Sequence, residues 1–163
     1  MNSRSLILPA LIALCAIGGL HCKSSDLAET PRHILEGDEL LLMGLTNDAR
    51  REHRLPALRI NRILVEISRY HGFDMAEREY FSHISPEGET YIDRARKFGY
   101  AYIALGENIA SGTESVNEVF QGWMASSEHR ANILNDQFTE IGIGIYVATD
   151  GQTYYTQTFG LPL

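Results

Sequence analysis

The sequence predicts an α+β fold in which helices pack on an antiparallel sheet. Apolar residues recur at intervals of three and four in the earlier part of the chain, which is typical of amphipathic helices. Residues 141–147 instead alternate Ile or Val with Gly or Tyr, the period-two pattern of a strand with one packed face. Asp150-Gly151 then predicts a hairpin turn into a second strand over residues 152–159. Helices that precede a terminal hairpin favour helices packed on one sheet.

The first two helices are predicted from apolar stripes and end signals. The first contains Leu40, Leu41, Met43 and Leu45. It is expected to end before Pro56, because the residue before a proline disfavours helical backbone angles. Asn61 can cap the second helix. The apolar stripe of the second helix is Ile63, Leu64, Ile67, His71 and Met75.

Turn chemistry divides the middle of the chain. Residues 85–88, Ser-Pro-Glu-Gly, predict a turn. Residues 91–98 predict a short helix that Gly99 closes, since glycine adopts the left-handed conformation common at helix ends. Residues 102–110 are expected to be extended around Gly106.

A third main helix is predicted from a capping box formed by Ser115 and Glu118. Its apolar residues are Val119, Phe120, Trp123 and Met124. Trp123 is expected to anchor this helix to the sheet, because an indole buries a large apolar area and needs only one acceptor. Gly142 and Gly144 are expected to let another element approach their strand closely.

The N-terminus has the pattern of an export signal. A single basic residue, Arg4, precedes an apolar run over residues 6–20. This run is shorter than the roughly 20 residues of a membrane-spanning helix, so a cleaved secretory signal over residues 1–21 is favoured over a permanent span. Polar residues 22–36 then predict a tether. Since 163 residues allow one ordinary domain, residues 37–163 are expected to form it.

Both cysteines lie in or just after the apolar run, at Cys15 and Cys22. A fold built on disulfides is therefore excluded. Cys22 begins a polar stretch, which resembles a bacterial lipoprotein signal with Cys22 as the lipidated residue; the alternative is ordinary cleavage nearby. Lipidation would anchor the chain to a membrane without spanning it. The protein is accordingly expected to be secreted or to lie in the outer envelope.

The charge of the chain argues against nucleic-acid binding. Fourteen Lys and Arg against twenty-one Asp and Glu give a net charge of -7, which repels phosphate backbones. A composition of 44% hydrophobic and 21% charged residues nevertheless supports a folded core.

Three titratable residues stand where local structure does not require them: His83, Glu107 and His129. Two neutral imidazoles and a carboxylate suit a divalent cation, zinc best among the common ions. The same three groups can support acid–base chemistry. Each of the three can also be a hydrogen-bonded structural residue. Their spacing in the sequence alone does not decide among metal binding, acid–base chemistry and a structural role.

Around these residues the chain resembles the CAP superfamily (cysteine-rich secretory proteins, antigen 5 and pathogenesis-related 1 proteins; the SCP domain) in its cysteine-free bacterial form. The resemblance extends from about residue 42 to residue 160. Its carriers are Asn47, Arg50, His71, Met75, Phe81-Ser82-His83, Gly106-Glu107-Asn108-Ile109-Ala110, Trp123-Met124, Ser126, His129-Arg130, Asn132-Ile133-Leu134, Ile141-Gly142-Ile143-Gly144, Tyr155-Thr156-Gln157 and Phe159-Gly160.

The resemblance implies an α-β-α sandwich with a central antiparallel sheet and a large cleft that gathers two His and two Glu. His83 and His129 correspond to the cleft histidines, and Glu107 to the first cleft glutamate. Ser126 occupies the position at which eukaryotic members have the second glutamate. The implied site for Zn²⁺ or Mg²⁺ is therefore weak or open, with water in the vacant position.

Three more residues are candidate ligand contacts: Asn108, Ser126 and Arg130. For two of them a structural role competes. Asn108 can hold the turn that carries Glu107, and Arg130 can pair with an acidic neighbour.

The sequence favours a binding module without catalytic activity, whose cleft takes a hydrophobic small molecule or another extracellular or envelope component. A membrane would be contacted only through the N-terminal lipid. The alternative is a metal-assisted hydrolase of cell-wall or protein substrates, with His83 or His129 as general base. It lacks an obvious nucleophile, although Ser82, Ser126 and Ser127 adjoin the histidines. A third possibility is an envelope protein that acts through its outer surface.

Overall fold

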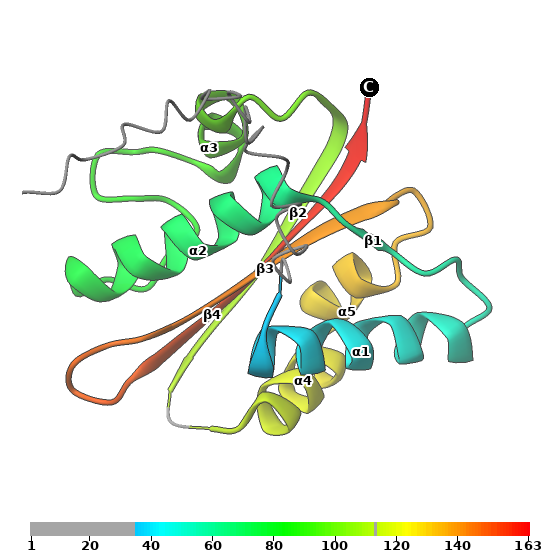
Figure 1. The fold of residues 1–163 in the computed structure, drawn as a ribbon, viewed down its shortest axis with the longest axis horizontal. Coiled ribbons are helices and arrows are strands. Elements are labelled where there is room, and N and C mark those ends of the chain that lie inside the picture. Colours follow the sequence, from blue (N-terminus) through cyan, green and yellow to red (C-terminus); the bar gives the residue numbers. More distant parts are fainter. Residues whose placement is uncertain (1–34, 113) are drawn as a thin grey trace, which may run out of the picture. The chain divides into compact units, whose positions relative to one another are not determined.

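The computed structural model describes residues 35–112 and 114–163. The predicted signal over residues 1–21, the lipidation of Cys22 and most of the tether at 22–36 lie outside the described residues. The elements, in chain order, are α1 (Gly37–Glu52), β1 (Arg59–Ile60), α2 (Arg62–Glu77), α3 (Tyr91–Phe98), β2 (Tyr102–Gly112), α4 (Val116–Ala125), α5 (Ser127–Ile133), β3 (Glu140–Val147) and β4 (Thr153–Pro162) (Figure 1).

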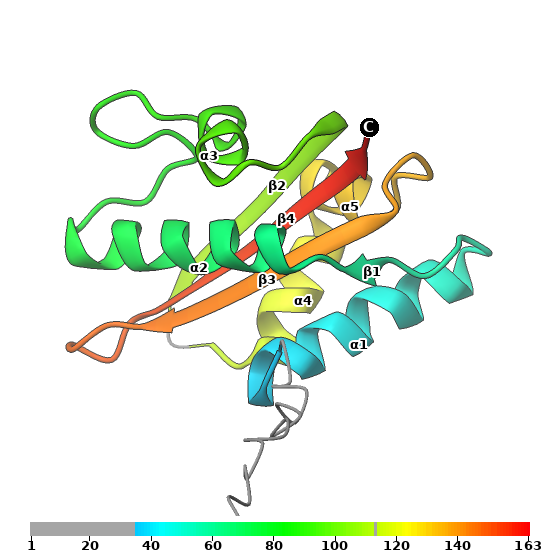
Figure 2. The same ribbon diagram turned by 45° about the horizontal axis from the view of Figure 1, so that its top comes forward.

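One sheet with the strand order β1-β3-β4-β2 forms the centre. The long strands pair antiparallel, β3 with β4 and β4 with β2, so the predicted hairpin is confirmed. The two-residue strand β1 adds a parallel edge beside β3, which the sequence did not predict. Helices α2 and α3 lie on one side of the sheet, and α1, α4 and α5 lie on the other (Figure 2). The predicted α+β fold, an α-β-α sandwich, is therefore confirmed.

The helix ends follow the predicted caps. The Asn61 side chain accepts hydrogen bonds from the first-turn N–H groups of Ile63 and Leu64, and Ser115 forms the expected capping box with Glu118. Gly99 ends α3 in the left-handed conformation, with a φ of 78°.

The main core lies between the sheet and the layer of α1, α4 and α5. Its buried residues are Leu35, Leu42, Leu58, Val65, Val116, Val119, Trp123, Ile133, Phe138, Ile141, Ile143, Tyr155 and Phe159. Trp123 is 2% exposed, and its indole N–H donates to the Ile109 carbonyl at 3.2 Å. The predicted anchoring of this helix to the sheet is thus confirmed.

Buried Arg50 joins α1 to the connection between α5 and β3. Its guanidinium donates to the backbone carbonyls of Pro56, Ile133, Asn135 and Phe138 at 2.7–3.2 Å. Fully buried arginine needs such acceptors, because an unpaired buried charge is costly.

On the opposite face, α2 lies directly on β3. A Cβ atom at Gly142 would stand 1.9 Å from the Leu64 carbonyl carbon, and one at Gly144 would stand 2.3 Å from the Arg69 backbone nitrogen. The close approach predicted for these glycines is confirmed. Within the described residues, no helix is both long and apolar enough to cross a membrane.

Gly142→Ala is expected to destabilise the fold strongly, because the added methyl meets helix backbone that cannot rotate aside. We expect a loss of about 3 kcal/mol in the free energy of unfolding, measured by urea denaturation. Gly44→Ala is the control: a Cβ there meets nothing within 4 Å, and alanine favours the helix, so stability should stay equal or rise by up to about 1 kcal/mol. Equal effects at the two positions would contradict the packing of α2 on β3.

Candidate functional site

Strand β2 carries Glu107 and Asn108 side by side. Successive side chains of a strand point to opposite faces of the sheet, so the two residues contact different helix layers. Glu107 contacts residues of α2, α3 and the loop between them, whereas Asn108 contacts α5. Because β2 is an edge strand, groups from both layers can come together beyond it.

The Glu107 carboxylate is buried, with 1% of its side chain exposed, and is fully engaged. Its Oε1 accepts from His83 Nδ1 at 2.9 Å and from an Arg94 nitrogen at 3.1 Å. Its Oε2 accepts from the same Arg94 nitrogen at 2.9 Å. The sequence predicted His83 and Glu107 as site residues, and the structure brings them into direct contact.

This environment keeps Glu107 ionised. Burial alone would raise the pKa of the carboxyl, but the hydrogen bond from His83 and the guanidinium of Arg94 outweigh it and hold the pKa below its ordinary value. An ionised carboxylate only accepts hydrogen bonds, so Nδ1 of His83 must be the donor. In neutral His83 the lone pair therefore lies on Nε2, the nitrogen that faces away from Glu107.

Arg94 is the partner that sequence reasoning missed. It is fully buried on α3 and also donates to the carbonyls of Glu89 and His83, so it holds the loop that presents the His83 ring. Glu107 lies thirteen residues further along the chain, on another element. No local pattern relates the two, although a buried arginine in a short helix is itself a signal that a charge partner exists.

His71 lies beneath the same carboxylate. Its predicted burial in the α2 stripe is confirmed: the ring is 0% exposed, and Nε2 is 3.8 Å from Glu107 Oε1. Neither ring nitrogen has a hydrogen-bond partner among the described residues. Burial lowers the pKa of His71 to about 4, so the ring is neutral at physiological pH.

On the other face, Asn108 fixes α5 against β2. It donates to the His129 carbonyl at 3.1 Å and accepts from Asn132 at 2.9 Å. Glu107 and Asn108 both lie within β2, so the expected extended segment over residues 102–110 is confirmed and the suggested turn around Glu107 is wrong. The structural role of Asn108 is instead a bridge between strand and helix.

The other two candidate contacts also have structural partners. The Ser126 hydroxyl caps α5 by accepting from the His129 N–H at 3.5 Å. Arg130 donates to the Met124 carbonyl at 3.5 Å, and in the described part of the chain it forms no ion pair with an acidic residue.

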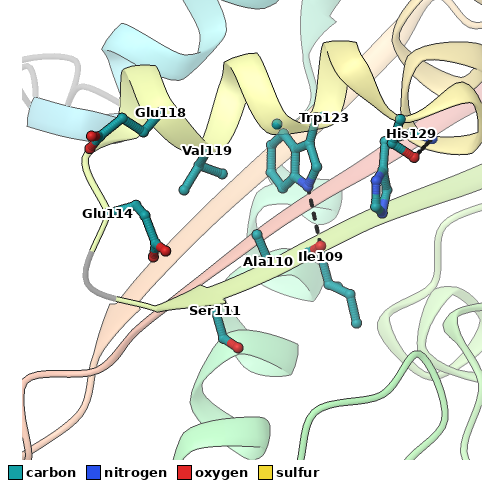
Figure 3. Close-up of a pocket in the computed structure, with 10 residues that line it drawn as sticks. Ile109, Ala110, Ser111, Glu114, Glu118, Val119, Trp123 and His129 are labelled. Carbon is teal, nitrogen blue, oxygen red and sulfur yellow. Dashed lines mark hydrogen bonds between the residues drawn. The ribbon is translucent and has the colours of Figure 1, made fainter.

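His129 lies at one end of a pocket between α4 and β2, with a volume of about 340 Å³ (Figure 3). The lining residues are Ile109, Ala110, Ser111, Glu114, Glu118, Val119, Gly122, Trp123, Ser126 and His129. The ring of His129 lies 6.3 Å from that of Trp123. Burial is the main cause that lowers the pKa of His129.

Glu107, one of the three residues predicted to bind a metal, is paired with Arg94. The guanidinium of Arg94 supplies the positive charge that a cation would bring to Glu107. No three His, Cys, Asp or Glu side chains within residues 35–112 and 114–163 are grouped as metal ligands would be. The imidazoles of His83 and His129 remain as donors, and metal binding by them stays a prediction.

Comparisons with known proteins identify the family of the chain and support its fold. The sequence profile of the cysteine-rich secretory protein family, CAP, matches residues 43–159. An uncharacterised protein of Bacillus subtilis (strain 168), YkwD, is 40% identical over 121 residues, which are 74% of this chain and 46% of YkwD.

Two solved structures are similar. An extracellular protein with an SCP domain from Bacillus anthracis str. Ames has 37% identity and a TM-score of 0.70, over 76% of this chain and 40% of that one. An outer surface protein of Borrelia burgdorferi has 23% identity and a TM-score of 0.73, over 77% of this chain and 93% of that one; this likeness concerns the fold. The chain spans less than half the length of YkwD and of the Bacillus anthracis protein.

His71 is expected to make the folded state less stable in acid. Its folded pKa of about 4 lies below the ordinary 6.5, so between these pH values the unfolded chain binds a proton that the folded chain does not. The free energy of unfolding should therefore fall by about 3 kcal/mol as the pH drops through this window. Urea denaturation from pH 7 to pH 4 measures this slope.

His71→Gln is the comparison variant, because glutamine does not titrate. Its stability should vary less with pH than that of the wild type, and the remaining slope should come from groups such as His129, whose pKa is also lowered. Identical slopes in both proteins would show that His71 does not carry the effect.

Proposed function

The chain belongs to the cysteine-rich secretory protein (CAP) family, and we propose that it is an extracytoplasmic binding module that takes a hydrophobic ligand in the pocket between α4 and β2. The single observation that carries this proposal is the pocket itself. Its middle is lined by Val119, Trp123 and the β2 backbone (Figure 3). A volume of about 340 Å³ lies within the range of small-molecule sites, which are mostly apolar with a few polar groups.

The location outside the cytoplasm has two supports. Residues 1–21 have the pattern of an export signal. A relative with 37% identity is an extracellular protein. Anchoring through a lipid at Cys22 is a further part of the proposal and rests on the sequence pattern alone.

Binding is favoured over catalysis because two of the three serine hydroxyls beside the histidines accept hydrogen bonds from the backbone. Ser126 caps α5, and the Ser82 hydroxyl accepts from the Ile84 N–H at 3.1 Å. A serine nucleophile needs its hydroxyl directed at a base, and neither contact provides that. The pocket needs no such group to hold an apolar molecule.

One observation favours hydrolysis as a second candidate function. Ionised Glu107 fixes the tautomer of His83 and leaves Nε2 as a base, the same relation in which a carboxylate orients histidine in acid–base sites. Water would then be the nucleophile. The substrate of such a hydrolase would be a cell-wall component or a protein.

Gly122→Leu tests the binding proposal by filling the pocket. Gly122 lines the pocket, and a Cβ there meets nothing within 4 Å, so leucine enters without strain. We expect the affinity for the neutral apolar probe N-phenyl-1-naphthylamine, measured by fluorescence titration, to fall about tenfold or more, which corresponds to about 1.4 kcal/mol of lost contact.

Gly44→Leu is the matched control, because Gly44 also lies in a helix with open space at its Cβ position but does not line the pocket. It should bind the probe like the wild type. Probe binding that survives Gly122→Leu unchanged would place the apolar site elsewhere.

We further infer that a divalent cation, Zn²⁺ or Mg²⁺, is held weakly by His83 and His129. Strong zinc sites have at least three protein ligands, and here Glu107 is occupied by Arg94. Isothermal calorimetry should show weak saturable binding of Zn²⁺ that His83→Ala/His129→Ala abolishes. Wild-type protein without binding heat, or heat that persists in the variant, would contradict this inference and weaken the case for a metal-assisted hydrolase.

A further inference from the structure

We propose that the ligand of the pocket between α4 and β2 is a cationic amphiphile, an apolar chain or ring system that carries an amine at one end. The inference rests on the proposed binding function and adds the charge of the ligand to it. It derives from the uneven distribution of polar groups along the pocket.

The pocket has an acidic end and a neutral end. Figure 3 shows Glu114 and Glu118 at the N-terminal end of α4, and Trp123 and His129 toward its C-terminal end. Val119 lies between them. An extended ligand along α4 therefore places one terminus beside two carboxylates and its body against Val119 and Trp123.

Nothing in the described lining balances these carboxylates. No Lys or Arg is among the described residues that line the pocket. His129 lies at the other end of the pocket, beside Trp123 and away from the two glutamates (Figure 3). The pocket thus presents two negative charges to its contents.

Both carboxylates remain available to a ligand. Glu118 uses Oε2 for the capping box with Ser115, which lowers the pKa of Glu118 and keeps it ionised. Its Oε1 accepts no hydrogen bond from the described residues. The carboxylate of Glu114 lies against the backbone of Gly112, since a Cβ atom there would be 1.9 Å from Oε2. It therefore lies near the end of β2, beside the pocket.

Electrostatics then separate three classes of amphiphile with the same apolar body. An ammonium group gains from both carboxylates, an alcohol gains little, and a fatty-acid carboxylate is repelled. Because both glutamates are exposed to solvent, the preference should weaken with salt. Apolar burial alone would make the three classes equal.

The test compares decylammonium, decanol and decanoate below their aggregation concentrations, by displacement of N-phenyl-1-naphthylamine from the full-length protein. We expect decylammonium to bind at least tenfold more tightly than decanoate at low salt, with decanol between them. The ratio should shrink toward one in 1 M NaCl and in Glu114→Gln/Glu118→Gln. Glutamine at position 118 can still complete the capping box, so that variant should keep its fold.

Glu52→Gln/Glu66→Gln is the charge control, because it removes two exposed carboxylates on α1 and α2 that do not line the pocket. It should keep the preference for the amine. Equal binding of all three amphiphiles, or a preference for decanoate, overturns the inference and leaves the proposed binding function intact. Failure of every amphiphile and of the fluorescent probe to bind overturns both.

Discussion

A carboxylate buried inside a protein needs a positive partner, and this constraint organises one side of the structure. Glu107 on β2 meets it through Arg94 on α3, and both side chains are almost fully buried. Arg94 also holds the carbonyls of Glu89 and His83, so one charge pair fixes a strand, a helix and the loop between α2 and α3. Loss of either partner would leave a buried charge unpaired, which is among the most destabilising changes in a protein.

The second organising feature is that β2 is an edge strand whose neighbouring residues serve opposite layers. Glu107 orders His83 on the side of α2 and α3, and Asn108 orders α5 and the His129 backbone on the other. Two histidines far apart in the sequence are attached in this way to adjacent residues of one strand. The candidate site is thus a product of strand alternation at the border of the sheet rather than of any single loop.

The sequence predicted the features that depend on interactions between residues close together in the chain. Asn61 as a cap, the buried stripe of α2 and the alternation of β3 were all predictable, because each depends on neighbours within a few residues. The Glu107–Arg94 pair was not, since it depends on tertiary placement. Nor was helix α5 predicted, which begins after Ser126; this residue adopts an extended conformation with a φ of -83° and a ψ of 128°.

The helices on the two faces of the sheet pack against it at different distances. The α2 backbone lies directly against the β3 backbone at Gly142 and Gly144, so a larger residue at either position has no room. On the other face, side chains such as Val119 and Trp123 fill the gap and set the size of the pocket. Divergence in this second layer can reshape the ligand space while the His83–Glu107–Arg94 cluster keeps its geometry. The space beside α4 therefore tolerates changes in side-chain volume that the backbone contacts at Gly142 and Gly144 do not.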